Sequence, residues 1–209
     1  NGDEIYAGGE SGSAASFETP AYTGGSYSGS TEGFVVELAD NANSAPTFNW
    51  LQWLGGTGND SVRALSVNAD EIYAGGSAGS ATSFETPAYT GGSYSGSDEG
   101  FVVELADTSS APILNWLQWL GGLSDASDIV RALAVSGDEL YAGGYTDASY
   151  SFSSATYTGG SYSGGDEGFV VELADNANSS PTLNWLQWLG GTGFDYVRAL
   201  SVNADEIYA

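Results

Sequence analysis

The stretch Asp70-Glu71-Ile72-Tyr73-Ala74 decides the fold of this chain because it recurs at a nearly constant interval. Its tyrosine returns at spacings of 67, 68 and 67 residues, as Tyr6, Tyr73, Tyr141 and Tyr208. A regular period of this length is typical of an array of like structural units. We expect units of about 67 residues at 1–67, 68–135 and 136–202, with 203–209 beginning a further one. The function of such an array is expected to reside in copies of one surface.

Each unit contains four short segments that are rich in β-branched or aromatic residues and bounded by Gly, Pro, Asn or Asp. In the first unit these segments are Glu4–Gly8, Phe34–Leu38, Phe48–Leu54 and Val62–Val67. Such segments are typical of β-strands. We find no apolar period of 3.6 residues over 11 residues. The sequence therefore predicts an all-β fold of four-stranded antiparallel units.

The predicted strands carry apolar residues on both faces, as in Phe34–Leu38 and in the Trp50–Leu54 segment. A sheet of this kind must be covered on both sides, as in the stacked blades of a β-propeller. A two-sheet sandwich, the alternative, would show cleaner alternation of apolar and polar residues. By analogy with other propellers, Val62–Val67 would be innermost. The strands that follow outward would be Glu71–Gly75, Phe101–Leu105 and Leu114–Leu120.

The run Trp53–Gly76, with its Gly-Gly turn, Asp60 and tyrosine strand, resembles the bacterial SBBP-type β-propeller repeat. The segment Glu99–Val103 is similar to a later part of that repeat, whereas the third unit departs from it by lacking a proline at Ser151–Ala155. The resemblance covers almost the whole chain, three times over. It implies a propeller and a secreted or surface setting, but no particular ligand.

Three units are too few to close a propeller ring, since such rings need at least four blades. We therefore expect the units to be part of a longer array or of an oligomeric ring. An open stack of near-identical units, which would form a filament, is a further alternative.

The charge of the chain is strongly negative, with 27 acidic residues against 3 arginines, no lysine and no histidine, for a net charge of −24. Nucleic acid and anionic membranes are therefore excluded as direct partners, because nothing offsets phosphate repulsion. No stretch of 18 apolar residues is present, so direct membrane insertion is not expected. Cysteine is absent, which excludes disulfides and thiol chemistry. We expect an extracellular or cell-surface protein that its carboxylates keep soluble.

The acidic residues also raise the alternative of specific Ca²⁺ sites, although we expect no cofactor. Adjacent acids recur, for example as Asp70-Glu71, Asp98-Glu99 and Asp166-Glu167. Adjacent residues of a strand point in opposite directions, whereas Ca²⁺ needs six to eight converging oxygens. We therefore expect these acids to solvate turns.

The longest connection in each unit, at 10–33, 77–100 and 145–168, interleaves aromatic residues with Ser, Gly and Thr. Its aromatic residues are Phe17, Tyr22, Tyr27, Phe84, Tyr89, Tyr94, Phe152, Tyr157 and Tyr162. Aromatic rings beside hydroxyl groups suit contacts with glycans or with another protein. The alternative is that the connection folds back and its rings cover the sheet.

Each unit contributes one cation, as Arg63, Arg131 and Arg198. Each arginine follows an aspartate by three residues, namely Asp60, Asp128 and Asp195, and each unit also has a strand glutamate, as Glu37, Glu104 and Glu172. An ion pair between the arginine and one of these carboxylates is expected, because a lone buried charge is costly. Anion binding by a ring of arginines is the alternative.

Catalysis is not expected, because without His, Cys or Lys the usual nucleophile–base pairs and metal triads are missing. We expect a non-enzymatic structural or adhesive protein, a surface or filament component that presents repeated loops. Its partners would be copies of itself or other surface proteins. The alternative is a lectin-like propeller with one glycan site per blade, which would gain affinity through multivalency.

Overall fold

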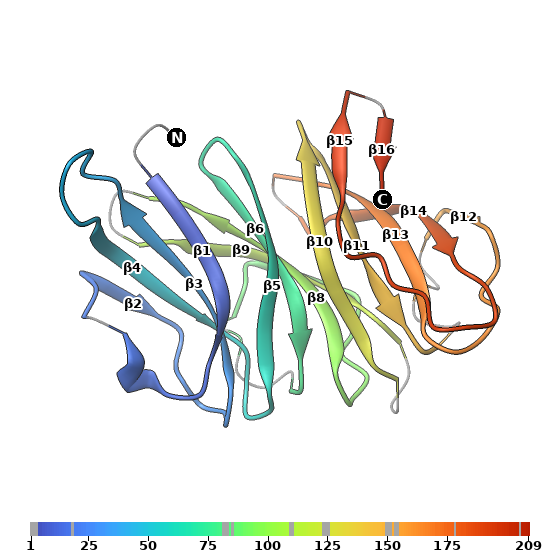
Figure 1. Ribbon diagram of the computed structural model, residues 1–209, viewed down its shortest axis with the longest axis horizontal. Helices are drawn as coiled ribbons and strands as arrows, with labels where there is room; N and C mark the ends of the chain where they lie inside the picture. The colour runs from blue at the N-terminus through green and yellow to red at the C-terminus, as the bar shows by residue number, and fades with distance from the viewer. Residues whose placement is uncertain are drawn as a thin grey trace.

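A computed structural model describes most of the chain (Figure 1). The described residues are 4–17, 19–80, 84, 86–108, 111–122, 126–148, 152, 155–177, 179–204 and 206–209. Asp3 and Asp205 of the recurring stretch, and parts of the predicted connections at 10–33, 77–100 and 145–168, lie outside them.

The described chain forms β-strands that gather into three large sheets and one small one, as the sequence predicts for an all-β fold. The first sheet contains β1 (Glu4–Ser11), β2 (Tyr22–Gly24), β3 (Glu32–Ala39) and β4 (Thr47–Leu54). The second contains β5 (Asp60–Asn68), β6 (Glu71–Ala78), β7 (Tyr89–Gly91), β8 (Glu99–Ala106) and β9 (Ile113–Leu120). The third contains β10 (Asp128–Ser136), β11 (Glu139–Thr146), β12 (Tyr157–Gly159), β13 (Glu167–Ala174) and β14 (Thr182–Leu189). The last is the pair β15 (Ser201–Asn203) and β16 (Glu206–Tyr208).

The second and third sheets have the same strand order, β5-β6-β8-β9-β7 and β10-β11-β13-β14-β12. The predicted order of the four main strands is therefore confirmed. Neighbouring main strands are antiparallel, with Tyr73 opposite Glu104 and Tyr141 opposite Glu172. The first sheet has the order β1-β3-β4-β2 and pairs Tyr6 with Glu37 in the same register.

The long connections are not structureless, because each contributes a short strand at the outer edge of its sheet. β2, β7 and β12 pair in parallel with β4, β9 and β14. The expectation of purely antiparallel, four-stranded units is corrected accordingly. In the first connection a short 3-10 turn, η1 (Ala14–Ser16), precedes this edge strand.

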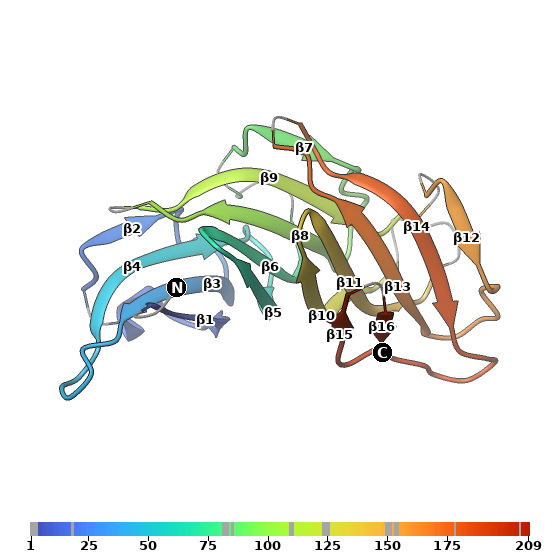
Figure 2. The ribbon, with the colours of Figure 1, turned by 90° about the horizontal axis from the view of Figure 1, so that it is seen from above.

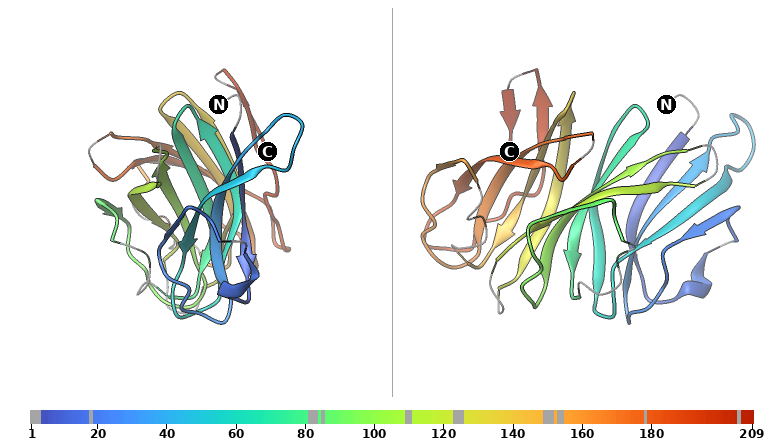
Figure 3. Two further views of the ribbon diagram at one scale, coloured as in Figure 1. Left: turned by 90° about the vertical axis from the view of Figure 1, so that its left-hand side faces the viewer. Right: turned by 180° about the vertical axis from the view of Figure 1, so that it is seen from behind.

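The three large sheets stand side by side along the longest axis of the molecule (Figure 1), as the view from behind also shows (Figure 3). Seen from above they follow an open arc, with β1, β5, β10 and β15 on its inner side and β2, β7 and β12 on its outer side (Figure 2). The described strands do not close into a ring. Apolar side chains fill the spaces between sheets, for example Trp50 with Phe101 and Trp116 with Phe169. In the described residues no helix is long and apolar enough to cross a membrane.

Candidate functional site

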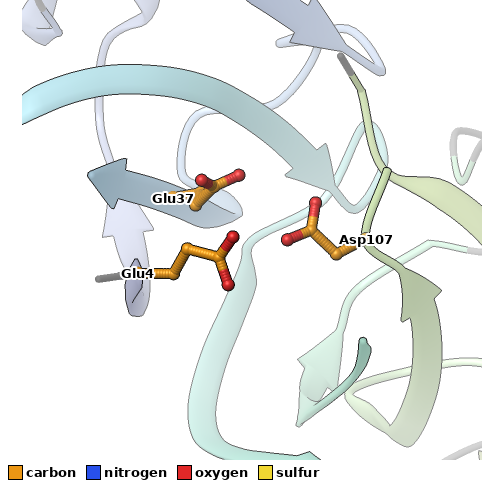
Figure 4. Close-up of side chains that lie close together, drawn as sticks. All are labelled: Glu4, Glu37 and Asp107. Atoms are coloured by element: carbon orange, nitrogen blue, oxygen red, sulfur yellow. The ribbon is translucent and has the colours of Figure 1, made fainter. Parts of the chain in front are cut away.

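Two clusters of three carboxylates lie where one sheet meets the next. The first is formed by Glu4 at the start of β1, Glu37 on β3 and Asp107 after β8, and their carboxylates point toward one another (Figure 4). The second repeats it one unit later with Glu71, Glu104 and Asp175. In each cluster one oxygen from each of the three carboxylates lies within 4.8 Å of the other two. The antiparallel register produces this arrangement, because the two glutamates lie on neighbouring strands near their ends and the aspartate comes from the following sheet.

Neutral donors hold these carboxylates in place. Tyr6 and Trp50 donate to Asp107, at 2.5 Å from the hydroxyl and 3.3 Å from Nε1. Asn49 Nδ2 donates to Glu37 at 2.6 Å.

The second cluster has the same set of donors. Tyr73 and Trp116 donate to Asp175 at 2.8 and 3.0 Å, and Asn115 donates to Glu104 at 2.6 Å. The carboxylate cluster and its hydrogen-bond donors therefore recur together at both sheet junctions.

Burial raises the pKa of the strand glutamates in these clusters. Desolvation raises the pKa of Glu37 above its usual range, although the hydrogen bond from Asn49 opposes the shift. Desolvation likewise raises the pKa of Glu104 to about 7, with further contributions from Asp175 and Glu71 and an opposing one from Asn115. Three close carboxylates can hold a divalent cation, so these are the residues that could bind a metal.

A cleft of about 740 Å³ opens beside the first cluster. Its walls come from the first and second sheets and include Tyr22, Asn49, Asp70 and Thr108 together with the three carboxylates. The Tyr22 ring is 39% exposed, whereas Trp50 is almost wholly buried. The cleft therefore offers one accessible ring among amide, hydroxyl and carboxylate groups.

The predicted aromatic residues of the connections fall into two groups. Six of them pack on their own sheet against the core, namely Phe17 and Tyr27 on Trp53, Phe84 and Tyr94 on Trp119, and Phe152 and Tyr162 on Trp188. The other three, Tyr22, Tyr89 and Tyr157, are exposed on the outer edge strands β2, β7 and β12. Of the nine predicted residues these three are the exposed ones, whereas Tyr27, Tyr94 and Tyr162 are half-buried.

The three arginines line one cavity of about 360 Å³. Arg63 also borders a neighbouring cleft with Glu10, Asp60 and Asp98. The expected partner Asp60 instead accepts the backbone N–H groups of Gly56 and Gly79, at 2.6 and 2.9 Å. Aromatic rings are the neighbours of two arginines, with Arg131 5.2 Å from the Tyr145 ring centre and Arg198 5.4 Å from that of Tyr196.

A second acidic feature, missed by sequence reasoning, is a wholly buried glutamate at the start of β3, β8 and β13. These residues are Glu32, Glu99 and Glu167. In each, Oε2 accepts the backbone N–H of a serine four residues earlier, whereas Oε1 is buried without a hydrogen-bond partner in the described residues. The expectation that Glu99 and Glu167 solvate turns is therefore wrong. Their recurrence in Glu-Gly-Phe-Val-Val was the available signal.

Glu99 faces another acid, since its Oε1 and Asp128 Oδ2 lie 2.1 and 2.4 Å from the position that a Cβ on Gly121 would occupy. Glu167 and Asp195 meet in the same way at Gly190. Desolvation raises the pKa of Glu99, and also that of Glu32, whose pKa Asp60 raises further.

No protein-family model matches this chain. It is similar to the regulatory protein FlaEY of Caulobacter vibrioides (strain ATCC 19089 / CIP 103742 / CB 15), with 29% identity over 209 residues, or 95% of this chain. The chain spans 21% of the length of that relative. The resemblance to SBBP-type repeats stays a prediction.

Proposed function

We propose that the chain is a non-enzymatic structural scaffold in which each sheet is a propeller-type blade of the SBBP kind. We place it in an extracellular or surface protein, as its large excess of acidic residues favours. The observation that carries the proposal is that the sheet junctions are built alike. The recurrent polar residues of the chain are used to join one sheet to the next.

Each junction is directional. Tyr6 and Trp50 of the first sheet donate to Asp107 next to the second, and Tyr73 and Trp116 of the second donate to Asp175 next to the third. One end of the array thus presents an acceptor side and the other a donor side.

The end positions of the array show this polarity. Asp40, which follows β3 as Asp107 follows β8, is exposed. At the other end Tyr141 and Trp185 donate to Glu139 and Glu172 of their own sheet. An exposed acceptor and donors of this kind are complementary, so they favour contact with a further sheet of the same kind, in the same chain or in another copy, which leads to a ring if the rotation closes and to a filament if it does not.

Mass measurement over a concentration series, together with electron microscopy, tests this proposal on the intact chain. We expect concentration-dependent rings or fibres. Asp40→Ala removes the acceptor end and should weaken association by about tenfold or more, as expected for loss of a charge-assisted hydrogen bond. Glu10→Ala removes an equal charge from another exposed side chain and serves as the control. A protein that stays monomeric at all concentrations would contradict self-assembly.

A second candidate function is glycan binding, which the cleft beside Tyr22 favours. An exposed ring bordered by amide and carboxylate groups suits the apolar face and the hydroxyls of a sugar. Glycan screening with the wild type and with a combined Tyr22, Tyr89 and Tyr157→Ala variant tests this function. Phe194→Ala removes another exposed ring as a control. Binding that the triple variant retains would exclude these tyrosines as the site.

A further inference from the structure

All the cationic side chains of this chain meet at one place. The sequence contains three arginines and no lysine or histidine. In the described residues the lining of the 360 Å³ cavity consists of Arg63, Arg131 and Arg198. Three like charges in one cavity repel one another, so their convergence within a chain of net charge −24 requires an explanation.

The backbone forms a β-bulge at two of the three arginines. In the pairing of β5 with β6, Val62 lies opposite Gly76 and Ala64 opposite Gly75, so Arg63 is the extra residue of a β-bulge. Arg131 occupies the same place in β10, between Val130 and Ala132. Bulges re-aim a side chain and are frequent beside functional sites. The two bulged strands lie next to each other on the inner side of the arc (Figure 2).

Arg198 completes the set from the segment that leads into β15, which also lies against β10. Each repeat thus contributes its arginine from the same position in the recurring Val-Arg-Ala-Leu.

In the described part of the chain no carboxylate is among the residues that line this cavity, although Arg63 also borders a neighbouring cleft with Glu10, Asp60 and Asp98. Asp60 and Asp195 are held by backbone N–H groups, from Gly56 and Gly79 in the first case and from Gly191 in the second. Arg131 Nε is buried without a hydrogen-bond partner. The Tyr145 and Tyr196 rings contact guanidinium groups and can hold them in place, but they do not neutralise them.

We propose that Arg63, Arg131 and Arg198 form a binding site for a multivalent oxyanion of the sulfate or phosphate class. The planar guanidinium group matches the oxygens of such an anion with paired N–H donors. The negative field of the whole molecule opposes entry of any anion, so only one that makes several charge-assisted hydrogen bonds is retained. The site therefore discriminates sulfate and phosphate from chloride. The anion can be a free ion or the sulfate group of a larger ligand.

Calorimetric titration of the intact chain with sodium sulfate or sodium phosphate, at constant ionic strength set with sodium chloride, tests the site. Concentrations of a few millimolar avoid the general stabilisation that sulfate gives at high concentration. We expect saturable binding. A sulfated oligosaccharide and its unsulfated counterpart form a second pair of titrations. If the sulfated sugar binds more tightly than inorganic sulfate, the ligand is a larger molecule that carries a sulfate group. If the two bind equally, the ligand is the free ion.

Removing one guanidinium group should weaken binding by about tenfold, the equivalent of one charge-assisted interaction. The variants are Arg131→Gln and, at exposed positions where folding is less at risk, Arg63→Gln and Arg198→Gln. Arg131→Lys keeps the charge without the paired donors and should bind with intermediate affinity. The control Asn43→Asp lowers the net charge by the same amount as an Arg→Gln substitution, but on an exposed loop. It should bind the anion as the wild type does. Absence of saturable binding, or equal binding by all variants, would overturn the proposal.

Discussion

At the scale of single residues, Tyr73 shows how the sheets are joined. Its hydroxyl lies 2.8 Å from Asp175 and 3.0 Å from Glu71, and the side chain is wholly buried. Burial, followed by the hydrogen bond to Asp175, raises its pKa well above the ordinary value, so the hydroxyl stays protonated as a donor.

We expect Tyr73→Phe to lower the free energy of unfolding by roughly 1–3 kcal/mol, because it leaves the half-buried carboxylates of Asp175 and Glu71 without this donor. Urea unfolding measures the change. Tyr157→Phe removes a hydroxyl from a ring that is 73% exposed and should change stability by less than about 0.5 kcal/mol. Equal effects of the two substitutions would mean that the junction hydrogen bond contributes nothing.

Glu104 should make stability depend on pH. Its pKa in the folded state is about 7 against an ordinary 4.5, mainly through burial, so the native state holds a proton that the unfolded chain has released. The native state therefore gains stability as pH falls from about 7 toward 4.5. Urea unfolding at several pH values should show that Glu104→Gln removes this gain and stabilises the protein above pH 7 by at least about 1 kcal/mol. Asn115→Ala removes the amide that favours the charged form of Glu104. The increase in stability on lowering the pH should therefore begin at a higher pH in this variant.

Sequence reasoning found some of the site residues but not their partners. The strand glutamates and arginines were recognised because each occurs once per repeat in a fixed context. Asp107 and Asp175 were missed, because the donors that hold them come from the preceding sheet, 57 to 102 residues away. Their only sequence signal is the recurring Leu-Ala-Asp after a strand. Pairing across sheets depends on three-dimensional packing, which a linear pattern does not encode.

At the scale of elements, the bulge in the inner strand depends on the second glycine of Ala-Gly-Gly. A Cβ on Gly76 would lie 1.8 Å from the carbonyl oxygen of Ser61, and one on Gly144 equally close to that of Ile129. We expect Gly76→Ala to cost roughly 3 kcal/mol or more, because backbone would have to move and the bulge at Arg63 with it. Thermal unfolding measures the loss. Gly191→Ala, where no atom lies within 4 Å of the new Cβ, should be nearly neutral.

The main strands could be predicted because their β-branched and aromatic segments, and the turn residues that bound them, recur with the period of the chain. The edge strands could not, as Tyr89–Gly91 shows. Three residues among serines and glycines carry no strand pattern, and their pairing partner, Trp116–Gln118, lies on the far side of β8 in sequence. A strand of this length exists only because the neighbouring strand offers unpaired backbone groups.

At the scale of the whole molecule, the second sheet is covered on both faces and should be the most stable part. β6 and β8 are buried almost throughout, whereas β1 alternates between exposed and partly buried residues. Amide hydrogen exchange should therefore be at least about tenfold slower in β6 and β8 than in β1, since local opening follows burial. Uniform protection across the sheets would indicate that the array opens only as one cooperative unit.

Differences in side-chain volume explain why the sheets follow an arc (Figure 2). Gly8 on β1, Gly75 on β6 and Gly143 on β11 let the next sheet approach so closely that an added Cβ would lie 2.6 to 2.7 Å from Val62, Val130 or Val197. Farther out, the buried indoles of Trp50 and Trp116 keep neighbouring sheets apart. Each sheet is thus a wedge, thin at its inner edge and thick at its outer one. The curvature of the arc is therefore set by the contrast between a glycine and a tryptophan. A repeat with valine in place of the glycine would build a straighter stack from the same strands.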